Sequence, residues 1–531
     1  MDMVDQSTDE ESNSSSSLST HSQHMRAALN DCSKLVERLH ELLHLKSTDP
    51  CVQDTEQLSL NIEHSKHVQQ LFHSAWLLSE NIELERELVL QRLRETSELD
   101  IVYVDKNGWH RDGDKSGIPL TSSDFKQEYC FRNVPCIIRG FDELEFKDTS
   151  LKWRKSDTTP TDATLGNESR INTSWFERYV GDDTMVPVRI DGKNELDKDG
   201  RAEECETIMM SLKDWISSCQ QQSRSNQGGE VSREYLKDWH LVQLLQSRQS
   251  AEDDVGCTLP LYKTPEYFER DLLNNFLAKY SDGGDYKFVY WGPSGSITRL
   301  HSDVLHSFSW SYNVTGSKKW TFYIPNTNSD SGSSDETESS TCTRSDGTLR
   351  SFEVIQNTGE TMFVSSKIKH EVVNLVETLS INHNWITSAN IDNTWQCICS
   401  EIDAIEGEIK EWEVIPVDDF EARENMLRGC IGLDVTTFFL MILLEVSELF
   451  VHVFADIDEI SEIDNETMQE YAISICNLVE VLGKVSTSNE AKTAQRLQAV
   501  LGSKSKANQA DGLAAFVLSL RDSLNEQHCS L

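Results

Sequence analysis

The sequence predicts an α+β protein in which a β-rich central region, residues 98–392, lies between two helical regions. Three observations support this fold class. Apolar residues recur at helical spacing in residues 25–96 and again in residues 393–531. The central region instead contains short β-like runs separated by clusters of Gly, Asn, Asp and Ser. The chain has 531 residues, which is enough for two or more domains with cores of their own.

The N-terminal part of the chain changes character near residue 25. Residues 1–24 are rich in Ser, Asp and Glu and nearly free of apolar side chains, so we expect them to be disordered. Residues 25–96 have apolar positions three and four apart, which predicts a helical hairpin that packs on itself or on a partner. These positions include Met25, Leu29, Cys32, Val36, Leu39 and Leu43, and later Val68, Leu71, Phe72, Ala75 and Trp76.

The C-terminal region, residues 393–531, also predicts helices. One apolar stripe has spacings of three and four and comprises Trp395, Ile398, Ile402, Ile405, Ile409 and Trp412. The stripe lasts under three heptads, which favours burial within the domain over a dimer seam. Self-association through the terminal helices is the alternative.

Composition excludes several classes of function. The chain carries 49 basic and 89 acidic residues, a formal net charge of -40, so we expect no direct nucleic-acid binding. The 13 cysteines contain no CxxC pair, which favours free thiols in a reducing compartment, the cytoplasm or alternatively the nucleus. The N-terminus is polar, unlike a secretory signal. The apolar run Phe438–Leu444 is too short to span a bilayer, so we expect no membrane association.

A candidate metal site begins at His301 and Asp303. Residues 307–314 alternate between polar and apolar side chains, which is the period of a strand. If the strand extends back, His301 and Asp303 point the same way because they are two residues apart. Two histidines and one carboxylate are the usual ligands of a non-haem Fe(II) oxygenase. A second copy of the pattern, His110–Asp112, lies in a loop-like stretch, and we discard it.

Lys318 begins the next predicted strand, after the predicted turn Thr315–Ser317. A buried ammonium needs an anion, and the neighbouring strand offers no acid, so a ligand carboxylate is indicated. The alternative is a strand-end lysine that extends to water. The apolar face that Lys318 shares comprises Trp320, Phe322 and Ile324.

A third ligand has to come from further along the chain. Residues 326–350 are almost purely Ser, Thr, Asp, Asn and Gly, which predicts a disordered loop between two strands. Two β-like runs follow it, Gly359–Val364 and His370–Leu375. A histidine in apolar company is more often a core residue than a ligand, so the case for His370 depends on the pair upstream.

Ordered motifs across residues 120–415 resemble the jumonji-C (JmjC) oxygenases, and within them the group called jumonji domain-containing protein four. The first half of the resemblance lies in Asn133-Val-Pro-Cys136, Tyr235-Leu-Lys-Asp-Trp-His240, Tyr262-Lys-Thr-Pro265, Phe288-Val-Tyr-Trp-Gly-Pro293 and Thr298-Arg-Leu-His-Ser-Asp303. The second half lies in Ser307-Phe-Ser-Trp-Ser311, Gly316-Ser-Lys-Lys-Trp320, Gly359-Glu-Thr-Met-Phe-Val364, His370, Asn374-Leu375 and Ser380-Ile-Asn-His-Asn-Trp385.

The resemblance implies a double-stranded β-helix, also called a cupin or jelly-roll barrel, with helices around it. It implies an enzyme that consumes O2 and 2-oxoglutarate, releases succinate and carbon dioxide, and hydroxylates a C–H bond. Similar proteins are lysyl hydroxylases that act on a translation termination factor in the cytoplasm. The implied Fe(II) ligands are His301, Asp303 and His370, and the implied 2-oxoglutarate pocket holds Lys318, Thr298 and Asn382.

One stretch departs from the family pattern. Where the family has a Pro-Ser-Gly-Trp-type stretch just before the distal histidine, this chain has Ser365–Lys369. We expect a flexible, basic wall here, which would place His370 less firmly and reduce turnover. A catalytically weakened cupin scaffold that acts through interactions is therefore a rival to the active hydroxylase.

Three further alternatives follow from other motifs. His40–His44 is an HExxH string on a predicted helix, the pattern of a zinc peptidase, but nothing upstream could form a substrate edge. Asp112–Gly117 resembles half of a calcium-binding loop, although Ser123 stands at the position of the bidentate glutamate. A histone lysine demethylase would share the JmjC core, but the chain shows neither zinc-finger spacing nor a basic patch.

Overall fold

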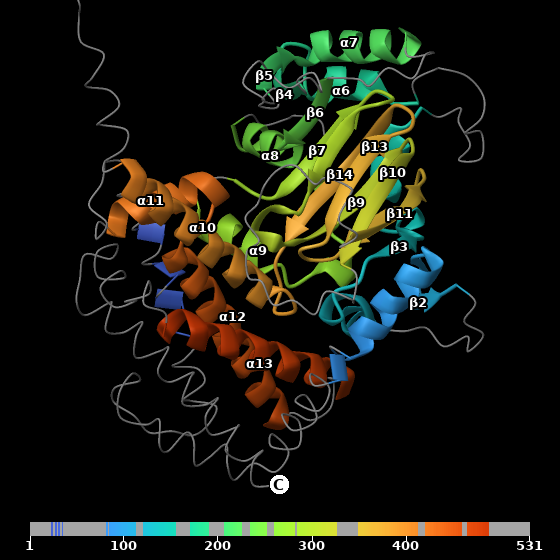
Figure 1. Cartoon of the computed structure of the whole chain (residues 1–531). Helices are drawn as coiled ribbons and strands as arrows, with labels where there is room; N and C mark the ends of the chain where they lie inside the picture. The colour runs from blue at the N-terminus through green and yellow to red at the C-terminus, as the bar shows by residue number, and fades with distance from the viewer. Residues whose placement is uncertain are drawn as a thin grey trace, which may run out of the picture. The chain divides into compact units, whose positions relative to one another are not determined.

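The computed structural model separates into two compact units, which we describe one at a time (Figure 1). One unit holds the β-sheets and comprises residues 85–269 and 285–384. The other is helical and comprises residues 1–84, 270–284 and 385–531. The structure describes residues 23–24, 27–28, 30–31, 34, 81–82, 84–112, 121–155, 170–190, 206–225, 234–251, 260–281, 284–325, 349–412, 420–458 and 465–487.

The β-rich unit contains a ten-stranded and a four-stranded sheet. In the larger sheet the order is β2 (Gly108–Arg111), β1 (Asp100–Asp105), β3 (Cys136–Arg139), β12 (Thr361–Val364), β9 (Phe308–Thr315), β14 (Thr378–Trp385), β7 (Lys287–Gly292), β6 (Glu234–Trp239), β4 (Met185–Ile190) and β5 (Glu206–Ser211). In the smaller sheet the order is β11 (Leu349–Gln356), β10 (Lys318–Pro325), β13 (Lys369–Asn374) and β8 (Ile297–His301). These sheets confirm the predicted α+β class with a jelly-roll core.

The hairpin from β9 to β10 forms as the alternation predicts. Gly316 makes the turn with φ of 101°, and a Cβ there would lie 2.6 Å from the carbonyl oxygen of Glu377 and from Cα of Thr378, so only glycine fits. The apolar face of β9 is fully buried, and its polar face is buried as well, with Ser311 and Asn313 at most 3% exposed. The larger sheet is therefore covered on both sides at β9, and the polar face of β9 points into the interior of the β-rich unit.

Helices and aromatic side chains cover the apolar face of β9. Phe146 stacks on Tyr312 with ring centroids 4.1 Å apart, and Phe268 stacks on Trp310 at 5.4 Å. Such burial of large rings dominates the stabilisation of a core. The helical segments of this unit are α4 (Ser122–Phe125), the π-helical turn η1 (Lys126–Phe131), η2 (Phe141–Glu143), α5 (Lys147–Trp153), α6 (Thr173–Tyr179), α7 (Leu212–Ser225), α8 (Leu241–Ala251), η3 (Glu266–Phe268) and η4 (Val304–His306).

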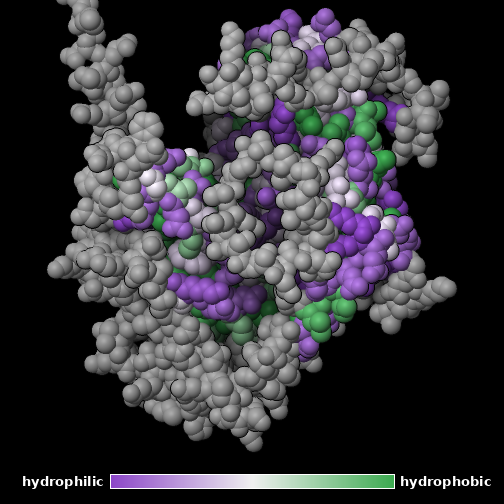
Figure 2. All heavy atoms as spheres, viewed as in Figure 1, coloured by the Kyte–Doolittle hydropathy of each residue, from purple (hydrophilic) through white to green (hydrophobic). Residues whose placement is uncertain are grey.

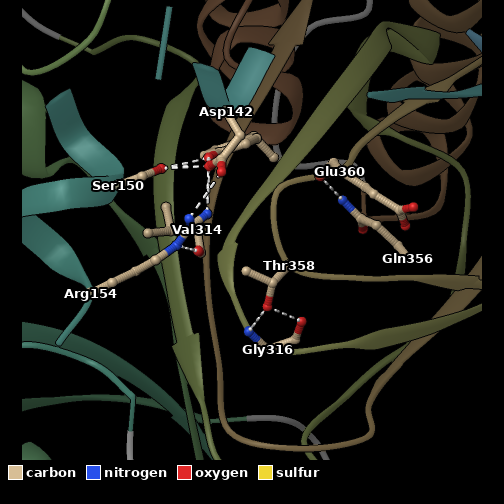
Figure 3. A network of polar contacts seen from close by, with 9 residues as sticks. Asp142, Ser150, Arg154, Val314, Gly316, Gln356, Thr358 and Glu360 are labelled. Atoms are coloured by element: carbon tan, nitrogen blue, oxygen red, sulfur yellow. Dashed lines mark hydrogen bonds and ion pairs between the residues drawn. The ribbon is translucent and has the colours of Figure 1, made fainter. Parts of the chain in front are cut away.

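An ion pair fixes α5 to β9 (Figure 3). Arg154, which follows α5, donates to both carboxylate oxygens of Asp142, at 2.6 and 3.1 Å, and its Nε donates to the carbonyl of Val314. Ser150 donates to the same carboxylate at 2.9 Å, and the Tyr312 hydroxyl donates to it as well. Burial raises the pKa of Asp142, but the hydrogen bonds from Arg154 and Tyr312 outweigh it, so the pKa lies below its ordinary value.

The helical unit contains α9 (Leu272–Tyr280), α10 (Ile391–Trp412), α11 (Phe420–Ile431), α12 (Val435–Asp458) and α13 (Asn465–Thr487). The stripe predicted on α10 is buried at Trp395, Ile398, Ile405 and Ile409, and Trp395 stacks on Phe438 of α12 at 5.8 Å. Arg270 pairs with Glu445 at 3.2 Å, which satisfies a carboxylate inside this core. The stripe therefore packs within the unit, as its short length predicts.

The apolar segment of α12 is longer than the run Phe438–Leu444 on which the sequence-based expectation rested. By length and composition, Val435–Val453 could cross a membrane, so the argument that the run is too short was wrong. However, 78% of the apolar window is buried inside the structure. Residues that are hydrophobic all round and buried are those of a core helix, and the structure shows α12 as one.

Three expected boundaries lie elsewhere in the structure. The helix that ends at Thr96 was assigned to the N-terminal region, but its Leu93 is 1% exposed in a core cluster with Ile137 and Trp320 of the β-rich unit. Residues 270–284 lie inside the predicted β-rich region yet belong to the helical unit. The expected loop 326–350 overlaps β11, which begins at Leu349.

Surface composition follows the acidic, polar sequence. Hydrophilic residues cover much of the described surface on the face shown in Figure 2, with hydrophobic patches between them. Residues 1–22 of the expected disordered segment, most of the expected hairpin 25–96 and most of the loop 326–350 lie outside the described residues. The last two residues of the expected disordered segment, Gln23 and His24, are helical.

We predict that Arg154→Met lowers the free energy of unfolding by about 2–3 kcal/mol at pH 7, because it leaves the Asp142 carboxylate without its cation. The folded-state pKa of Asp142 is lowered, so the pair stabilises the fold above the unfolded pKa and loses this effect as the pH falls through the folded pKa. Urea unfolding at neutral pH and below pH 4 measures both effects. Lys147→Met on α5 removes the same charge at an exposed position, and equal losses in the two variants would contradict the assignment.

Candidate metal centre

The three predicted ligand side chains converge at one end of the smaller sheet. His301 is the last residue of β8, Asp303 follows two residues later, and His370 is the second residue of β13. β8 and β13 are antiparallel neighbours in which His370 pairs with His301. One ligand atom from each of the three side chains lies within 4.8 Å of the others. Within the described part of the chain, this is the one group of three or more metal-ligating side chains.

Hydrogen bonds orient the three side chains toward one point. Nδ1 of His301 lies 2.8 Å from the carbonyl oxygen of Arg299, and Nδ1 of His370 lies 3.1 Å from that of Ile368. Each Nδ1 therefore carries the proton, and Nε2 is left as the ligand atom. Ser309 of β9 donates to Oδ2 of Asp303 at 2.7 Å, and Oδ1 lies 3.9 Å from Nε2 of His301.

The electrostatics of the cluster suit a cation. Removal from water and the neighbouring His370 lower the pKa of His301 to about 4, so its imidazole is neutral at physiological pH. The ring centroids of the two histidines lie 4.4 Å apart. Two imidazoles and one carboxylate on one side of a point form the donor set of non-haem Fe(II), and the residues present fit that ion. The side chain of His301 is 34% exposed, so the cluster is open to solvent.

Lys318 lies deeper between the two sheets. It is 2% exposed, so the alternative of a lysine that extends to water is wrong. Its Nζ crosses from the smaller sheet to donate to Ser311 of β9 at 3.1 Å and to Ser380 of β14 at 2.7 Å. Among the described residues no carboxylate lies within ion-pair distance of this Nζ. Burial and the nearby charge of Lys237 lower the pKa of Lys318 to about 7.

Of the other two residues expected around 2-oxoglutarate, Asn382 lies near Lys318 and Thr298 lies on β8. Asn382 of β14 is 8% exposed and donates at 3.0 Å to the hydroxyl of Ser380, the same hydroxyl that Lys318 contacts. Thr298 is half-buried on β8, three residues before His301, and pairs with Val372 of β13. The structure therefore places Asn382 beside Lys318 and Thr298 on the strand that carries His301.

The stretch Ser365–Lys369 is not the flexible wall that the sequence led us to expect. Ser365 and Ser366 are 3% and 2% exposed, and the backbone of Ser366 is hydrogen bonded on both sides to the side chain of Asn133. The expectation of flexibility failed because these contacts come from a residue more than two hundred positions away, which local sequence does not reveal. Basic residues remain at Lys367 and Lys369, and both are exposed.

Sequence reasoning missed the serines that hold the site. Ser309 and Ser311 alternate on the polar face of β9, a pattern visible in the sequence, but nothing local showed that this face turns inward. Ser380 gave no signal of its own. Lys237 lies on β6, and its side chain lies over the ring of Tyr290, 5.4 Å from the ring centroid. The charge of Lys237 lowers the pKa of Lys318.

The rival motifs find no support. His40–His44 lies outside the described residues, as does most of the calcium-loop-like stretch after Asp112. The discarded copy at His110 lies on β2 and not in a loop, so that description was wrong, but its imidazole is exposed and stacks on Tyr103 at 5.6 Å. Among the described residues, His110 belongs to no group of three metal-ligating side chains.

Comparison with known proteins agrees with this geometry. Residues 288–385 match the family model of the JmjC domain, hydroxylase. Over 328 residues the chain is 33% identical to the 2-oxoglutarate and iron-dependent oxygenase JMJD4 of Homo sapiens, covering 60% of this chain and 71% of the relative. Over 340 residues it is 31% identical to JMJD4 of Gallus gallus, covering 60% and 71%. Over 349 residues it is 29% identical to the arginine-specific demethylase JMJ20 of Arabidopsis thaliana, covering 61% and 68%.

The matched region contains both halves of the ligand set and the strand that carries Lys318. The identity to JMJD4 extends well beyond the JmjC domain itself, over more than two thirds of those relatives. The chain belongs to the JmjC-domain oxygenase family, in the group that contains the JMJD4 proteins.

Proposed function

We propose that the protein is an Fe(II)- and 2-oxoglutarate-dependent dioxygenase that hydroxylates a lysyl side chain of a translation termination factor. The convergence of His301, Asp303 and His370, with a buried lysine between the same two sheets, carries the proposal. The names of the JMJD4 relatives support iron and 2-oxoglutarate. The lysyl substrate and a cytoplasmic location are parts of this proposal, and both rest on the family resemblance of the sequence.

The chain's own residues divide the work between two ends of the pocket. At the open end, Nε2 of His301, Oδ1 of Asp303 and Nε2 of His370 would hold the iron. At the buried end, the ammonium of Lys318 would bind the distal carboxylate of 2-oxoglutarate as an ion pair, since it has hydroxyl partners but no acid. Bound Fe(II) with O2 would supply the oxidative decarboxylation of 2-oxoglutarate to succinate and carbon dioxide, coupled to insertion of one oxygen into a C–H bond.

Polar side chains position this arrangement before any ligand binds. Ser309 keeps the Asp303 carboxylate turned toward His301, and the two backbone carbonyls keep the imidazoles in one tautomer. Asn382 and Ser380 hold the pocket around Lys318. Because these groups are already hydrogen bonded, binding of iron and 2-oxoglutarate requires little reorganisation of the protein.

We predict that His301→Ala, Asp303→Ala and His370→Ala each abolish succinate formation and remove the thermal stabilisation of the protein by Fe(II) or Mn(II), because each removes one of three ligands. Purified protein is incubated with Fe(II), 2-oxoglutarate and a candidate termination factor, and the factor is analysed by mass spectrometry. The expected product has gained one oxygen on a lysyl residue. His110→Ala serves as the matched histidine control.

The same assay separates the alternatives. An arginine-specific demethylase, which the JMJ20 match favours, would remove methylene units from a methylated arginyl peptide and add no oxygen to the termination factor. A histone lysine demethylase would do so on methyl-lysine. A catalytically weakened scaffold would form no succinate and gain no stability from metal. Full activity in all three ligand variants would rule out the iron assignment.

We predict that Lys318→Met raises the KM for 2-oxoglutarate about 10- to 100-fold, because the distal carboxylate loses its charge-assisted hydrogen bond. Succinate formation over a range of 2-oxoglutarate concentrations measures the effect. Lys319→Met is the matched control, since its side chain lies on the opposite face of β10 and pairs with Glu353 at 2.8 Å. If both variants keep the wild-type KM, the carboxylate binds elsewhere.

We predict that 2-oxoglutarate binding takes up a proton above pH 7. The pKa of Lys318 is lowered to about 7 in the free protein, so the amine is neutral above that pH, and a bound carboxylate raises its pKa again. The dissociation constant should therefore rise about tenfold per pH unit above pH 7. Titration calorimetry in buffers of different ionisation enthalpy counts the proton. A wild-type protein without proton uptake, or a Lys318→Met variant that retains it, would contradict the assignment.

A further inference from the structure

The side chain of Asn133 forms hydrogen bonds with both the N–H and the carbonyl group of Ser366. The Ser366 N–H donates to Oδ1 of Asn133 at 2.7 Å, and Nδ2 of Asn133 donates to the carbonyl oxygen of Ser366 at 3.1 Å. The two residues are 233 positions apart. A carboxamide that both accepts and donates in this way replaces a peptide group of a neighbouring strand.

The strand register explains why an asparagine side chain is needed. β3 and β12 are antiparallel, with Ile138 opposite Thr361 and Cys136 opposite Phe363. The same register continued by three residues would place Asn133 opposite Ser366. The backbone cannot continue the ladder there, because Pro135 has no N–H and Asn133 has φ of 53°, which turns the chain away. The side chain of Asn133 therefore provides the hydrogen bonds that the backbone has lost.

Residues 365–369 are connected by hydrogen bonds to the turn that carries Asp303. The hydroxyl of Ser366 donates at 2.5 Å to the carbonyl oxygen of His306, the last residue of η4. Ser302, the residue before Asp303, donates at 3.3 Å to the carbonyl oxygen of Lys367. The segment before the third ligand and the segment that carries the first two are thus joined by two hydrogen bonds.

The segment also orients the imidazole of His370. The carbonyl oxygen that fixes its Nδ1 belongs to Ile368, two residues after Ser366. Ser366 and His370 are each 2% exposed, so little water can replace a lost hydrogen bond. A shift of this backbone would therefore rotate the ring and displace its Nε2 from the other two ligand atoms.

We propose that Asn133 is a positioning residue of the metal centre, which holds residues 365–369 and thereby fixes His370 and the turn after Asp303. The inference rests on the proposed iron site. Asn133 touches neither ligand side chain in the structure and acts through the backbone of Ser366. It supplies, from the β3 side, the rigidity that the sequence of residues 365–369 lacks.

The test is Asn133→Ala in the full-length protein, with Mn(II) as the probe. Loss of a group that orients a ligand weakens metal binding by about 10- to 100-fold, and we expect that range for the Mn(II) dissociation constant measured by electron paramagnetic resonance. The kcat should fall while the KM for 2-oxoglutarate stays near the wild-type value, because the Lys318 end of the pocket is untouched. Ile138→Val is the control, since it weakens the packing of β3 without removing the hydrogen bonds between Asn133 and Ser366.

Hydrogen exchange of the metal-free protein provides a second readout. Asn133→Ala should speed exchange in peptides that cover residues 302–307 and 365–370, and Ile138→Val should leave them unchanged. Unchanged exchange in Asn133→Ala, or faster exchange with an unchanged Mn(II) dissociation constant, overturns the proposal. Failure of the wild-type protein to bind Mn(II) would instead overturn the proposed iron site, and the two failures are thus distinguishable.

Ser366→Ala separates the two connections if Asn133→Ala does not fold. It keeps both backbone hydrogen bonds to Asn133 and removes only the hydroxyl that reaches His306. We expect a several-fold weaker Mn(II) affinity and faster exchange confined to the turn after Asp303. An Mn(II) affinity equal to that of the wild type would show that this turn is held without the segment, which contradicts the proposed path.

Discussion

The pairing of His370 with His301 across β13 and β8 is the constraint on which the site depends. These residues are 69 positions apart in sequence, and only the antiparallel register places their rings 4.4 Å from each other. The register shifts between His370 and Val372, so the ladder is irregular at the ligand itself. Such irregularities re-aim a side chain where a ladder would otherwise dictate its direction. Removal of His301 from water, together with the repulsion that two protonated imidazoles at this separation would feel, lowers the pKa of His301.

Lys318 imposes a second constraint, because burying an ammonium is costly unless it is paired. Among the described residues it has two serine hydroxyls and no acid within ion-pair distance, which satisfies its hydrogen bonds but not its charge. A carboxylate side chain beside Lys318 would have stabilised the protein without its cosubstrate. It would also have filled the position that a dianionic cosubstrate needs. In the proposed function, the bound carboxylate of 2-oxoglutarate would supply the negative charge that this buried ammonium needs.

Sequence patterns over a few neighbouring residues predicted the features that a few neighbouring residues determine. The alternation of β9 and β10, the glycine turn between them and the burial of Lys318 all follow from a period of two over a few residues. The partners across the barrel do not, since Ser309, Ser311 and Ser380 acquire their roles only when two strands from different sheets face each other. The same limit applies to the helix that ends at Thr96, whose Leu93 packs with Ile137 and Trp320, and to α9, which packs on α12, because these partners lie far away in the sequence. An amphipathic pattern indicates that one face of an element is buried, but it does not identify the residues that pack against that face.

The wall before His370 shows how rigidity can be moved from one part of a chain to another. Leu305, His306 and Lys367 have φ of 57°, 46° and 64°, conformations that cost about 1–3 kcal/mol each for residues other than glycine. They persist only because surrounding contacts hold them, and the contacts present are those of Asn133, Ser302 and Ser366. A proline- and aromatic-rich wall would be stiff by its own covalent and packing properties. Here the side chains of Asn133, which precedes β3, Ser302, which follows β8, and Ser366 hold residues 365–369. The precision of the third ligand therefore depends on hydrogen bonds between this segment and distant parts of the chain.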